Sequence, residues 1–297
     1  MFYGLSLPHF GPYADAALLA ELAHEAEDSG WDGFFVWDHI GWGANSPEMV
    51  DPWIALAVAA HRTKTIRLGP MVTPLPRRRP VKVARETTSL DRLSNGRLIL
   101  GVGTGGGASE WDDLGEEPDH KVRGAMLDEA LEVVTGLWSG EVFSHDGEFY
   151  HIKEARFTPT PVQQPRVPVW VAGTWPTKNR LVNDAPFRRA AQWDGVFPIA
   201  RDLDWNEFLS PQHLAEIVAL VSSYRRDKGL AGPFDIVHGG ATPGEDKVKN
   251  AETVVSYAEA GATWWIENIL PNVYGWNWQG NWPLQAMRNR IQQGPPK

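Results

Sequence analysis

The sequence predicts one particular α/β fold, a (β/α)8 TIM barrel that forms a single domain over residues 1–297. Eight short apolar segments alternate with segments whose apolar residues recur at helical spacing, and no linker separates them. The apolar segments lack polar alternation, which is typical of strands buried on both faces of a parallel sheet. A doubly wound sheet is the alternative, but it normally has fewer units or a second domain.

Four strand–helix units are predicted in the first half of the chain. The first helix ends before Gly30, which suits the left-handed conformation of a helix C-cap, and the third is closed by the turn sequence Asn95-Gly96. A long loop precedes the fourth helix. The predicted strands are 2–8, 33–37, 66–72 and 97–103, and the predicted helices are 17–26, 52–61, 81–93 and 122–138.

The second half begins with an interruption of this pattern. Residues 141–158 alternate around Asp146-Gly147, which is a strong signal for a β-hairpin inserted into the barrel. Three units enter their strands with similar sequences: EDSGWDGFFVW, RAAQWDGVFPI and AEAGATWWIEN. The remaining predicted strands are 167–173, 194–199, 234–240 and 263–269, with one helix ending near residue 191 and others at 211–228, 246–260 and 283–291.

Composition excludes several classes of protein. The chain has no cysteine, which rules out disulfides, thiolate metal sites and cysteine nucleophiles. A net charge of -9 argues against nucleic-acid or anionic-membrane binding, and neither a membrane span nor a signal peptide is predicted. We therefore expect a cytoplasmic protein that acts on a small organic molecule. The one basic run, Arg77–Arg79, is best explained as a solvated loop, with an anion or subunit contact as the alternative.

The carboxyl ends of the predicted strands hold the candidate site residues, because barrel enzymes place their active sites there. Asp38 and His39 directly follow the second strand. Adjacent residues at a strand end point to opposite sides, so we expect one to reach the pocket and the other to hold its rim. Histidine titrates near neutral pH and can transfer a proton, which favours a functional pair. Many of the 15 tryptophans also fall at strand ends, where a pocket for a flat ligand, an interface or a bulky core would use them.

Two glycine-rich segments are candidate ligand loops. GVGTGG, residues 101–106, formally matches a dinucleotide fingerprint, but the next helix starts too far downstream for a Rossmann unit. Its backbone still permits close approach by a flat ligand or a phosphate. HGGATPGED, residues 238–246, follows the seventh strand, where many barrels bind phosphate. No metal-binding motif and no serine-hydrolase elbow is present in the sequence.

A family resemblance adds to these expectations. The strand ending in WDHIGW and the block DPWIALAVAAHRTKTIRLGPMVTPLPRRRPVKVARETTSLDRLSNGRLILGVGTGG resemble the bacterial luciferase-like superfamily. With VPVWVAG and YAEAGATWWIE, the resemblance covers nearly the whole chain. It implies the same barrel with an inserted excursion, a homodimer, and an oxidoreductase that uses flavin mononucleotide (FMN) or the deazaflavin F420.

The resemblance also implies roles for single residues. Asp38 is similar to an aspartate that contacts the deazaflavin tail or ring edge, His39 to a histidine near the hydride-transfer face, and Trp42 to an aromatic that stabilises the reacting substrate. Met71-Val72 falls where the family often has a non-prolyl cis peptide. Together with the glycine-rich loops, the expected cofactor contacts are Asp38, Met71, Val72, Thr73, Thr104, Gly105, Gly106, Gly173, Thr174, His238 and Gly239.

One departure from the family pattern affects the predicted chemistry. F420-dependent dehydrogenases of the family carry a catalytic glutamate directly after the Thr-Gly pair, where this chain has Gly106. Glu110, four residues later, is the candidate to replace it. We expect hydride transfer between F420 and an organic small molecule. The alternatives are an FMN-dependent monooxygenase supplied by a flavin reductase, a non-catalytic flavin- or anion-binding barrel, and a phosphate-binding lyase or isomerase.

Overall fold

The computed structural model describes residues 1–178, 182–203, 207–242 and 244–297. In this part of the chain a parallel sheet has the strand order β3-β2-β1-β11-β10-β9-β8-β5-β4. A parallel bridge between Leu68 and Leu98 joins its two ends, so the sheet closes into the predicted barrel. The strands are β1 Phe2–Leu7, β2 Gly33–Val36, β3 Arg67–Pro70, β4 Thr73–Pro74, β5 Leu100–Gly103, β8 Val169–Trp175, β9 Gly195–Ala200, β10 Asp235–Gly240 and β11 Trp264–Asn268.

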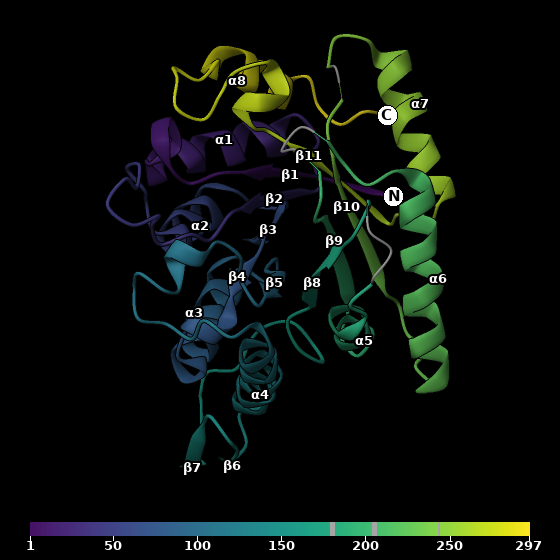
Figure 1. Ribbon diagram of the computed structural model, residues 1–297. Helices are drawn as coiled ribbons and strands as arrows, with labels where there is room; N and C mark the ends of the chain where they lie inside the picture. The colour runs from purple at the N-terminus through teal and green to yellow at the C-terminus, as the bar shows by residue number, and fades with distance from the viewer. Residues whose placement is uncertain (179–181, 204–206, 243) are drawn as a thin grey trace.

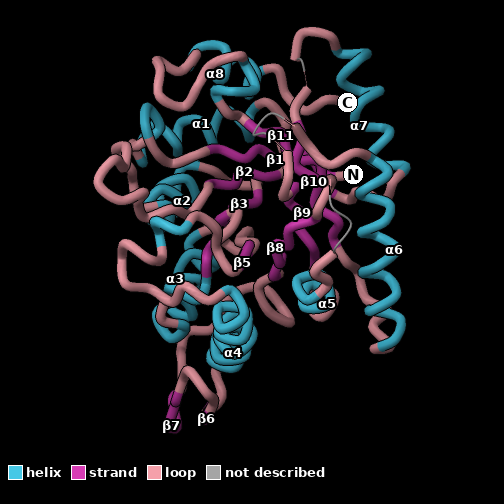
Figure 2. The backbone as a smooth tube through the Cα atoms, in the orientation of Figure 1, coloured by secondary structure: helices cyan, strands magenta, loops and turns pink. Residues whose placement is uncertain are grey.

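Helices surround the barrel on its outside, as Figures 1 and 2 show. Several begin at a side chain that accepts hydrogen bonds from the first free backbone N–H groups, among them Asp15, Asp51 and Asp119. The predicted helices are confirmed, with ends that differ by a few residues. They are α1 Ala16–Asp28, α2 Pro52–Arg62, α3 Pro80–Leu93, α4 His120–Trp138, α5 Ala185–Ala190, α6 Pro211–Asp227, α7 Lys247–Glu259 and α8 Leu284–Gln292. None of these described helices is long and apolar enough to cross a bilayer.

Two features interrupt the regular alternation. The third barrel strand is split into β3 and β4 by a cis peptide bond between Met71 and Val72, as the family resemblance implied. The predicted hairpin is formed by β6 Phe143–Asp146 and β7 His151–Ala155, and it extends away from the barrel beyond α4 (Figure 1). Glu129 of α4 accepts hydrogen bonds from three successive backbone N–H groups of the hairpin turn, which ties the excursion to the helix layer.

The pleat of the strands divides the core into two parts. In β2, Phe34 and Val36 belong to the large cluster beneath the helices, whereas Phe35 belongs to a second cluster with Trp170 and Trp264 from other strands. Because side chains alternate along a strand, this second cluster is the interior of the barrel. Its aromatic rings fill the lower part of the barrel.

The inward-facing positions become small toward the carboxyl ends of the strands. A Cβ atom added at Gly103 would lie 3.5 Å from Cβ of Ala172, and one added at Gly239 would lie 3.5 Å from the ring of Phe197. Farther along, Thr174 is exposed and Ile199 is 39% exposed. The barrel is therefore packed toward the amino ends of its strands and reaches solvent at their carboxyl ends, where the site lies.

Candidate active site at the carboxyl ends of the strands

His39 and Glu110 meet at the upper end of the barrel, although 71 positions separate them in the sequence. His39 follows β2, and Glu110 ends the short 3-10 helix η3, Ala108–Glu110, in the loop after β5. Nδ1 of His39 lies 3.0 Å from Oε2 of Glu110, whose side chain is 1% exposed, while the His39 side chain is 27% exposed. A ring nitrogen that faces a buried carboxylate carries the hydrogen, so Nε2 is the nitrogen available to a ligand.

The backbone at His39 is held from both sides. The N–H of His39 donates to Nε2 of His9 at 2.9 Å, and the N–H of Ile40 donates to Oε1 of Glu110 at 2.8 Å. His9 can accept at Nε2 because its Nδ1 donates to the carbonyl of Val50 at 2.7 Å. Burial lowers the pKa of His9, which keeps it in this neutral form. The position of His39, after β2, is thus fixed by residues that follow β1 and β5.

Asp38 points into the wall of the barrel, away from His39. Its carboxylate accepts hydrogen bonds from Arg78 at 2.8 Å, Thr73 at 2.7 Å, and Arg77 and Trp53 at 3.2 Å. Asp38 is 2% exposed, so both oxygens are satisfied within the protein. The geometry therefore does not support the cofactor contact predicted for Asp38; it anchors the strand end that carries His39. The prediction of a solvated Arg77–Arg79 loop is likewise wrong, because Arg77 and Arg78 are the partners of this carboxylate.

Arg77 links the two carboxylates. Its Nη2 lies 3.2 Å from Oδ1 of Asp38 and its Nη1 lies 3.3 Å from Oε2 of Glu110. Burial raises the pKa of both acids, but the arginines and hydrogen bonds at Asp38 outweigh it, as do His39, Arg77 and the Ile40 N–H at Glu110. Both pKa values lie below their ordinary values. Two acids and two arginines therefore form a balanced set of charges beneath His39.

Trp42 lies next to His39, with ring centroids 5.1 Å apart. Its ring meets Phe10 edge-on at 4.7 Å, and its backbone N–H donates to Oγ of Ser46 at 2.5 Å. The structure thus brings the predicted residues His39, Trp42 and Glu110 together.

The predicted cofactor contacts around the split third strand divide into two groups. Val72 is partly exposed and faces the glycines of β5, since a Cβ at Gly103 would lie 3.1 Å from its Cγ2. Met71 and Thr73 are buried, Met71 in the inner cluster and Thr73 against Asp38. Val72 is therefore the residue of this segment that a ligand could touch directly.

The loop after β5 follows the prediction more closely. Thr104 and Gly105 are partly exposed and Gly106 is exposed. Gly105 has a positive φ of 75°, and a Cβ there would lie 2.3 Å from the ring of Trp111, so only glycine fits. At Gly106 an added Cβ would meet nothing within 4 Å. Gly106 therefore leaves open space at the position of the family glutamate, while the buried Glu110 contacts His39.

The later strands place four predicted contacts differently from one another. Thr174 is exposed, whereas Gly173 is buried and a Cβ there would press on Pro186 of α5 at 2.9 Å. Gly239 is on the inward side of β10, but His238 faces the helices, with its ring 4.0 Å from that of Tyr257. His238 is 1% exposed, so the prediction that it contacts a ligand does not fit its position. Residue 243 of its loop lies outside the described residues.

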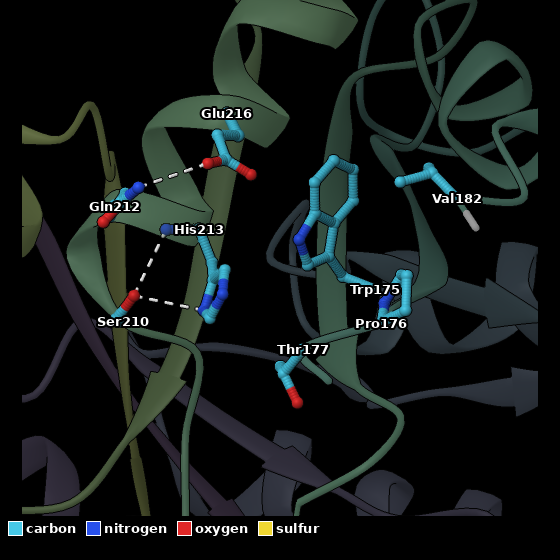
Figure 3. Close-up of a pocket in the computed structure, with 8 residues that line it drawn as sticks. All are labelled: Trp175, Pro176, Thr177, Val182, Ser210, Gln212, His213 and Glu216. Carbon is cyan, nitrogen blue, oxygen red and sulfur yellow. Dashed lines mark hydrogen bonds between the residues drawn. The ribbon is translucent and has the colours of Figure 1, made fainter. Parts of the chain in front are cut away.

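A cavity of ≈ 230 Å³ lies beside the end of β8 (Figure 3). Trp175 and Thr177 border it on one side, and Ser210, His213 and Glu216 at the start of α6 border it on the other, as Figure 3 shows. Ser210 caps α6 by accepting from the backbone N–H of His213 at 3.3 Å. The cavity combines a helix N-terminus with a carboxylate, which have opposite preferences for an anion. Among the described residues, no three His, Asp or Glu side chains are arranged to hold a metal ion.

Comparison with known proteins decides the family. The profile of a family described as luciferase-like monooxygenase matches residues 3–185. The chain belongs to this luciferase-like family. An F420-dependent glucose-6-phosphate dehydrogenase of Gordonia bronchialis is 35% identical over 175 residues, covering 58% of this chain and 51% of the relative. The oxygenase component of a flavin-dependent trigonelline monooxygenase of Acinetobacter baylyi is 30% identical over 163 residues, covering 55% and 44%. The chain thus spans about half the length of these relatives.

Solved structures of the luciferase-like family agree with the fold. An F420-dependent secondary alcohol dehydrogenase, solved in complex with an F420-acetone adduct, superposes with a TM-score of 0.77 at 17% identity, covering 99% of this chain and 98% of the other. At this identity the likeness establishes the barrel alone. Together with the profile match over residues 3–185, the shared barrel is consistent with membership of the luciferase-like family.

Sequence reasoning missed three residues of this luciferase-like site. Arg77 and Arg78 are predicted to lie in a solvated loop, and no role is predicted for His9. A signal exists for the arginines, because Asp38 directly follows a strand predicted to be buried, and a carboxylate buried there needs a cationic partner. No sequence signal pairs His9 with the backbone of His39, since that contact depends on the register of β1 against β2.

Proposed function

We propose that this protein is an F420-dependent oxidoreductase that transfers a hydride between F420 and an organic small molecule, with His39 as the proton-transferring residue. The observation that carries the proposal is the His39–Glu110 pair. A buried carboxylate binds Nδ1 of the partly exposed imidazole and leaves Nε2 as the ring nitrogen that can meet a substrate. This arrangement orients a general acid–base group without exposing its partner to water.

The residues present fit a flat ring system above the inner cluster. Small residues, Gly103, Ala172 and Gly239, occupy inward-facing positions and leave space there. Val72 lies beside Gly103 at the same end. We expect Val72, Thr104 and Thr174 to contact the cofactor, because they are predicted contacts whose side chains are at least partly exposed at this end. When bound, the deazaflavin would supply the carbon that accepts or donates the hydride.

The protein's own part in the reaction is the proton. In alcohol oxidation the hydride leaves the carbon and the hydroxyl proton passes to Nε2 of His39; in carbonyl reduction His39 returns that proton to the oxygen. The imidazolium that forms carries a positive charge next to the carboxylate of Glu110, 3.0 Å away. Such a carboxylate stabilises the charged ring and fixes its orientation.

The decisive test is a side-by-side titration of the purified protein with F420 and FMN, followed by fluorescence. We expect micromolar binding of F420 and binding of FMN at least about tenfold weaker. Gly106→Leu, which puts a bulky side chain into open space beside Thr104, should weaken F420 binding more than tenfold. The control is Gly232→Leu, at a glycine that is equally open but lies before β10 at the opposite end of the barrel. Equal effects of the two substitutions would overturn the placement of the cofactor.

An FMN-dependent monooxygenase is the second candidate, and two findings favour it. The matching family profile is described as a monooxygenase, and one relative is a flavin-dependent oxygenase component. Preferential binding of FMN in the same titration would select this function, and a flavin reductase would then be the expected partner. Binding of neither cofactor would refute both proposals, and binding without turnover of any substrate would favour a barrel that only binds a flavin.

A further inference from the structure

Aromatic side chains lie around the ring of His39. The centroid of its ring lies 5.1 Å from that of Trp42 and 5.8 Å from that of Trp37. Both tryptophans are partly exposed, and Trp37 is fixed by a hydrogen bond from Nε1 to Oγ of Ser6 at 3.0 Å. Both rings therefore lie next to the imidazole, and the hydrogen bond to Ser6 sets the orientation of Trp37.

A third tryptophan comes from the far end of the chain. Trp278, in the loop between the 3-10 helix η4, Pro271–Tyr274, and α8, lies 5.7 Å from the rings of both Trp37 and Phe10. Phe10 and Trp282 are buried behind it, at 4% and 7% exposure, while Trp278 is partly exposed. Rigid aromatic rings packed in this way offer large contact areas at a small cost in conformational entropy.

Lysine and arginine are absent from four of the loops at this end of the barrel. The loops that follow β1, β2, β5 and β11, residues 8–15, 37–51, 104–119 and 269–283, contain no lysine or arginine, and the loop after β5 alone contains six acids. Arg77 and Arg78 do lie nearby, but Asp38 and Glu110 neutralise them. Because a phosphate or carboxylate needs cationic or N–H partners in such a site, anionic substrates are disfavoured beside His39.

We propose that the substrate is an uncharged planar aromatic or conjugated molecule, which packs on Trp37, Trp42 and Trp278 while its reacting atom meets Nε2 of His39. The proposal rests on the proposed function for the reaction, but the recognition follows from the rings and charges alone. It assigns this chain a substrate class different from the phosphorylated sugar in the name of its Gordonia bronchialis relative.

Calorimetric titrations with three probes test this assignment, using the full chain with and without saturating F420. Acetophenone is the neutral aromatic probe, benzoate is its anionic match, and glucose 6-phosphate is the charged sugar. We expect acetophenone to bind at least about tenfold more tightly than benzoate, and glucose 6-phosphate to show no saturable binding. Equal or tighter binding of either anion would overturn the proposal.

Variants locate the probe. Trp42→Ala and Trp278→Ala should each raise the Kd of acetophenone about tenfold, as expected for loss of one stacking surface. The matched control is Trp276→Ala, in the same loop as Trp278 but 49% exposed, which should change the Kd less than twofold. Circular dichroism identifies any variant that fails to fold, and Trp42→Phe and Trp278→Phe then replace the alanine variants, with smaller but measurable losses. Unchanged affinity in both folded tryptophan variants would overturn the proposal.

The two proposals fail in different ways. If F420 and FMN do not bind but acetophenone retains this pattern in the cofactor-free protein, the proposed function is wrong and the recognition of neutral rings stands. If F420 binds as expected but the probes show no preference for the neutral ring, the substrate class is wrong and the cofactor assignment stands.

Discussion

Two regions at the strand ends each contain a histidine and a glutamate, but the two regions arrange these residues differently. His39 and Glu110 stand near β2 and β5, while His238 and Glu267 stand on β10 and β11. Both glutamates are 1% exposed. In the first region the glutamate binds the histidine, which reaches solvent; in the second, neither ring nitrogen of His238 has a hydrogen-bond partner among the described residues.

The difference comes from the direction of the histidine and from the partners of each group, because the two glutamates are equally buried. His238 points to the helix layer between Tyr257 and Trp265, and burial lowers its pKa to about 3. Burial also raises the pKa of Glu267, and Arg290 and Trp265 offset this only in part. Around Glu110, by contrast, the ionised form is favoured. A buried acid–base pair is thus ready for proton transfer only where the strand turns it toward solvent and supplies it with charge partners.

The largest effect is expected from Asp38→Ala, which removes the anchor of the first region. Arg77 and Arg78 would then lose the buried carboxylate that they share. Breaking a buried ion pair in this way costs about 3–5 kcal/mol of unfolding free energy. Urea denaturation measures the loss. Asp113→Ala, at an exposed acid of the loop after β5, is the control and should cost less than about 0.5 kcal/mol. A loss below about 1 kcal/mol for Asp38→Ala would contradict the anchoring role.

Glu110→Gln tests the catalytic half of the first region. The amide keeps the size and can still accept from the Ile40 N–H, but it does not stabilise a charged imidazole. We expect kcat to fall about 100-fold with KM nearly unchanged, measured as F420 oxidation or reduction under saturating substrate. Asp112→Asn, in the same loop and exposed, should behave like wild type. Full activity of the glutamine variant would remove Glu110 from the mechanism.

The pH dependence of the unfolding free energy tests the second region, which contains His238. Folded His238 stays neutral down to a pKa of about 3, while in the unfolded chain it takes up a proton below its ordinary pKa of 6.5. The unfolded state therefore binds more protons between these values, and stability falls as the pH falls, by about 1.4 kcal/mol for each unit well below 6.5. His238→Phe removes this contribution. The urea midpoints of the wild-type protein and of His238→Phe, measured at pH 7.5, 5.5 and 4.5, should approach each other or cross as the pH falls. A constant difference between the two midpoints would contradict this role of His238.

A smaller loss is expected from Thr73→Val, which keeps the shape of the side chain but deletes one donor to Asp38. The lost bond is 2.7 Å long and meets an ionised acceptor, so we expect about 1.5 kcal/mol in urea denaturation. Thr253→Val deletes a hydroxyl that bonds to the Lys249 carbonyl on an exposed face of α7, and it should cost less than about 0.5 kcal/mol. If the two substitutions cost the same, the Asp38 network has no special weight.

The sequence predicts the barrel well because its evidence is local. Non-alternating apolar strands, helical periodicity and the Asp146-Gly147 turn each depend on neighbouring residues, and the hairpin at 141–158 and the helices follow from them. Among the site residues, those that belong to one strand end, such as Asp38 and His39, were found in the same way. The sequence does not indicate toward which other strands their side chains point.

His238 and Arg77 illustrate that limit. Whether His238 faces the interior or the helices depends on the pleat of β10, and a shift of one residue would reverse it. Arg77 reaches Asp38 and Glu110 only because η2, Leu75–Arg77, lies between the second and fourth strand ends in space. The resemblance that implied a cofactor contact for Asp38 carries no information about that arginine pairing.

The most direct test of the account is the tautomer of His39, read by ¹⁵N nuclear magnetic resonance on histidine-labelled protein at pH 8. His39→Asn identifies its signals among those of the 9 histidines. We predict that the hydrogen lies on Nδ1 and that Nε2 is bare, and that this preference is lost in Glu110→Gln. A hydrogen on Nε2 in the wild-type protein would contradict it, because His39 would then have no free base to accept a proton from a substrate.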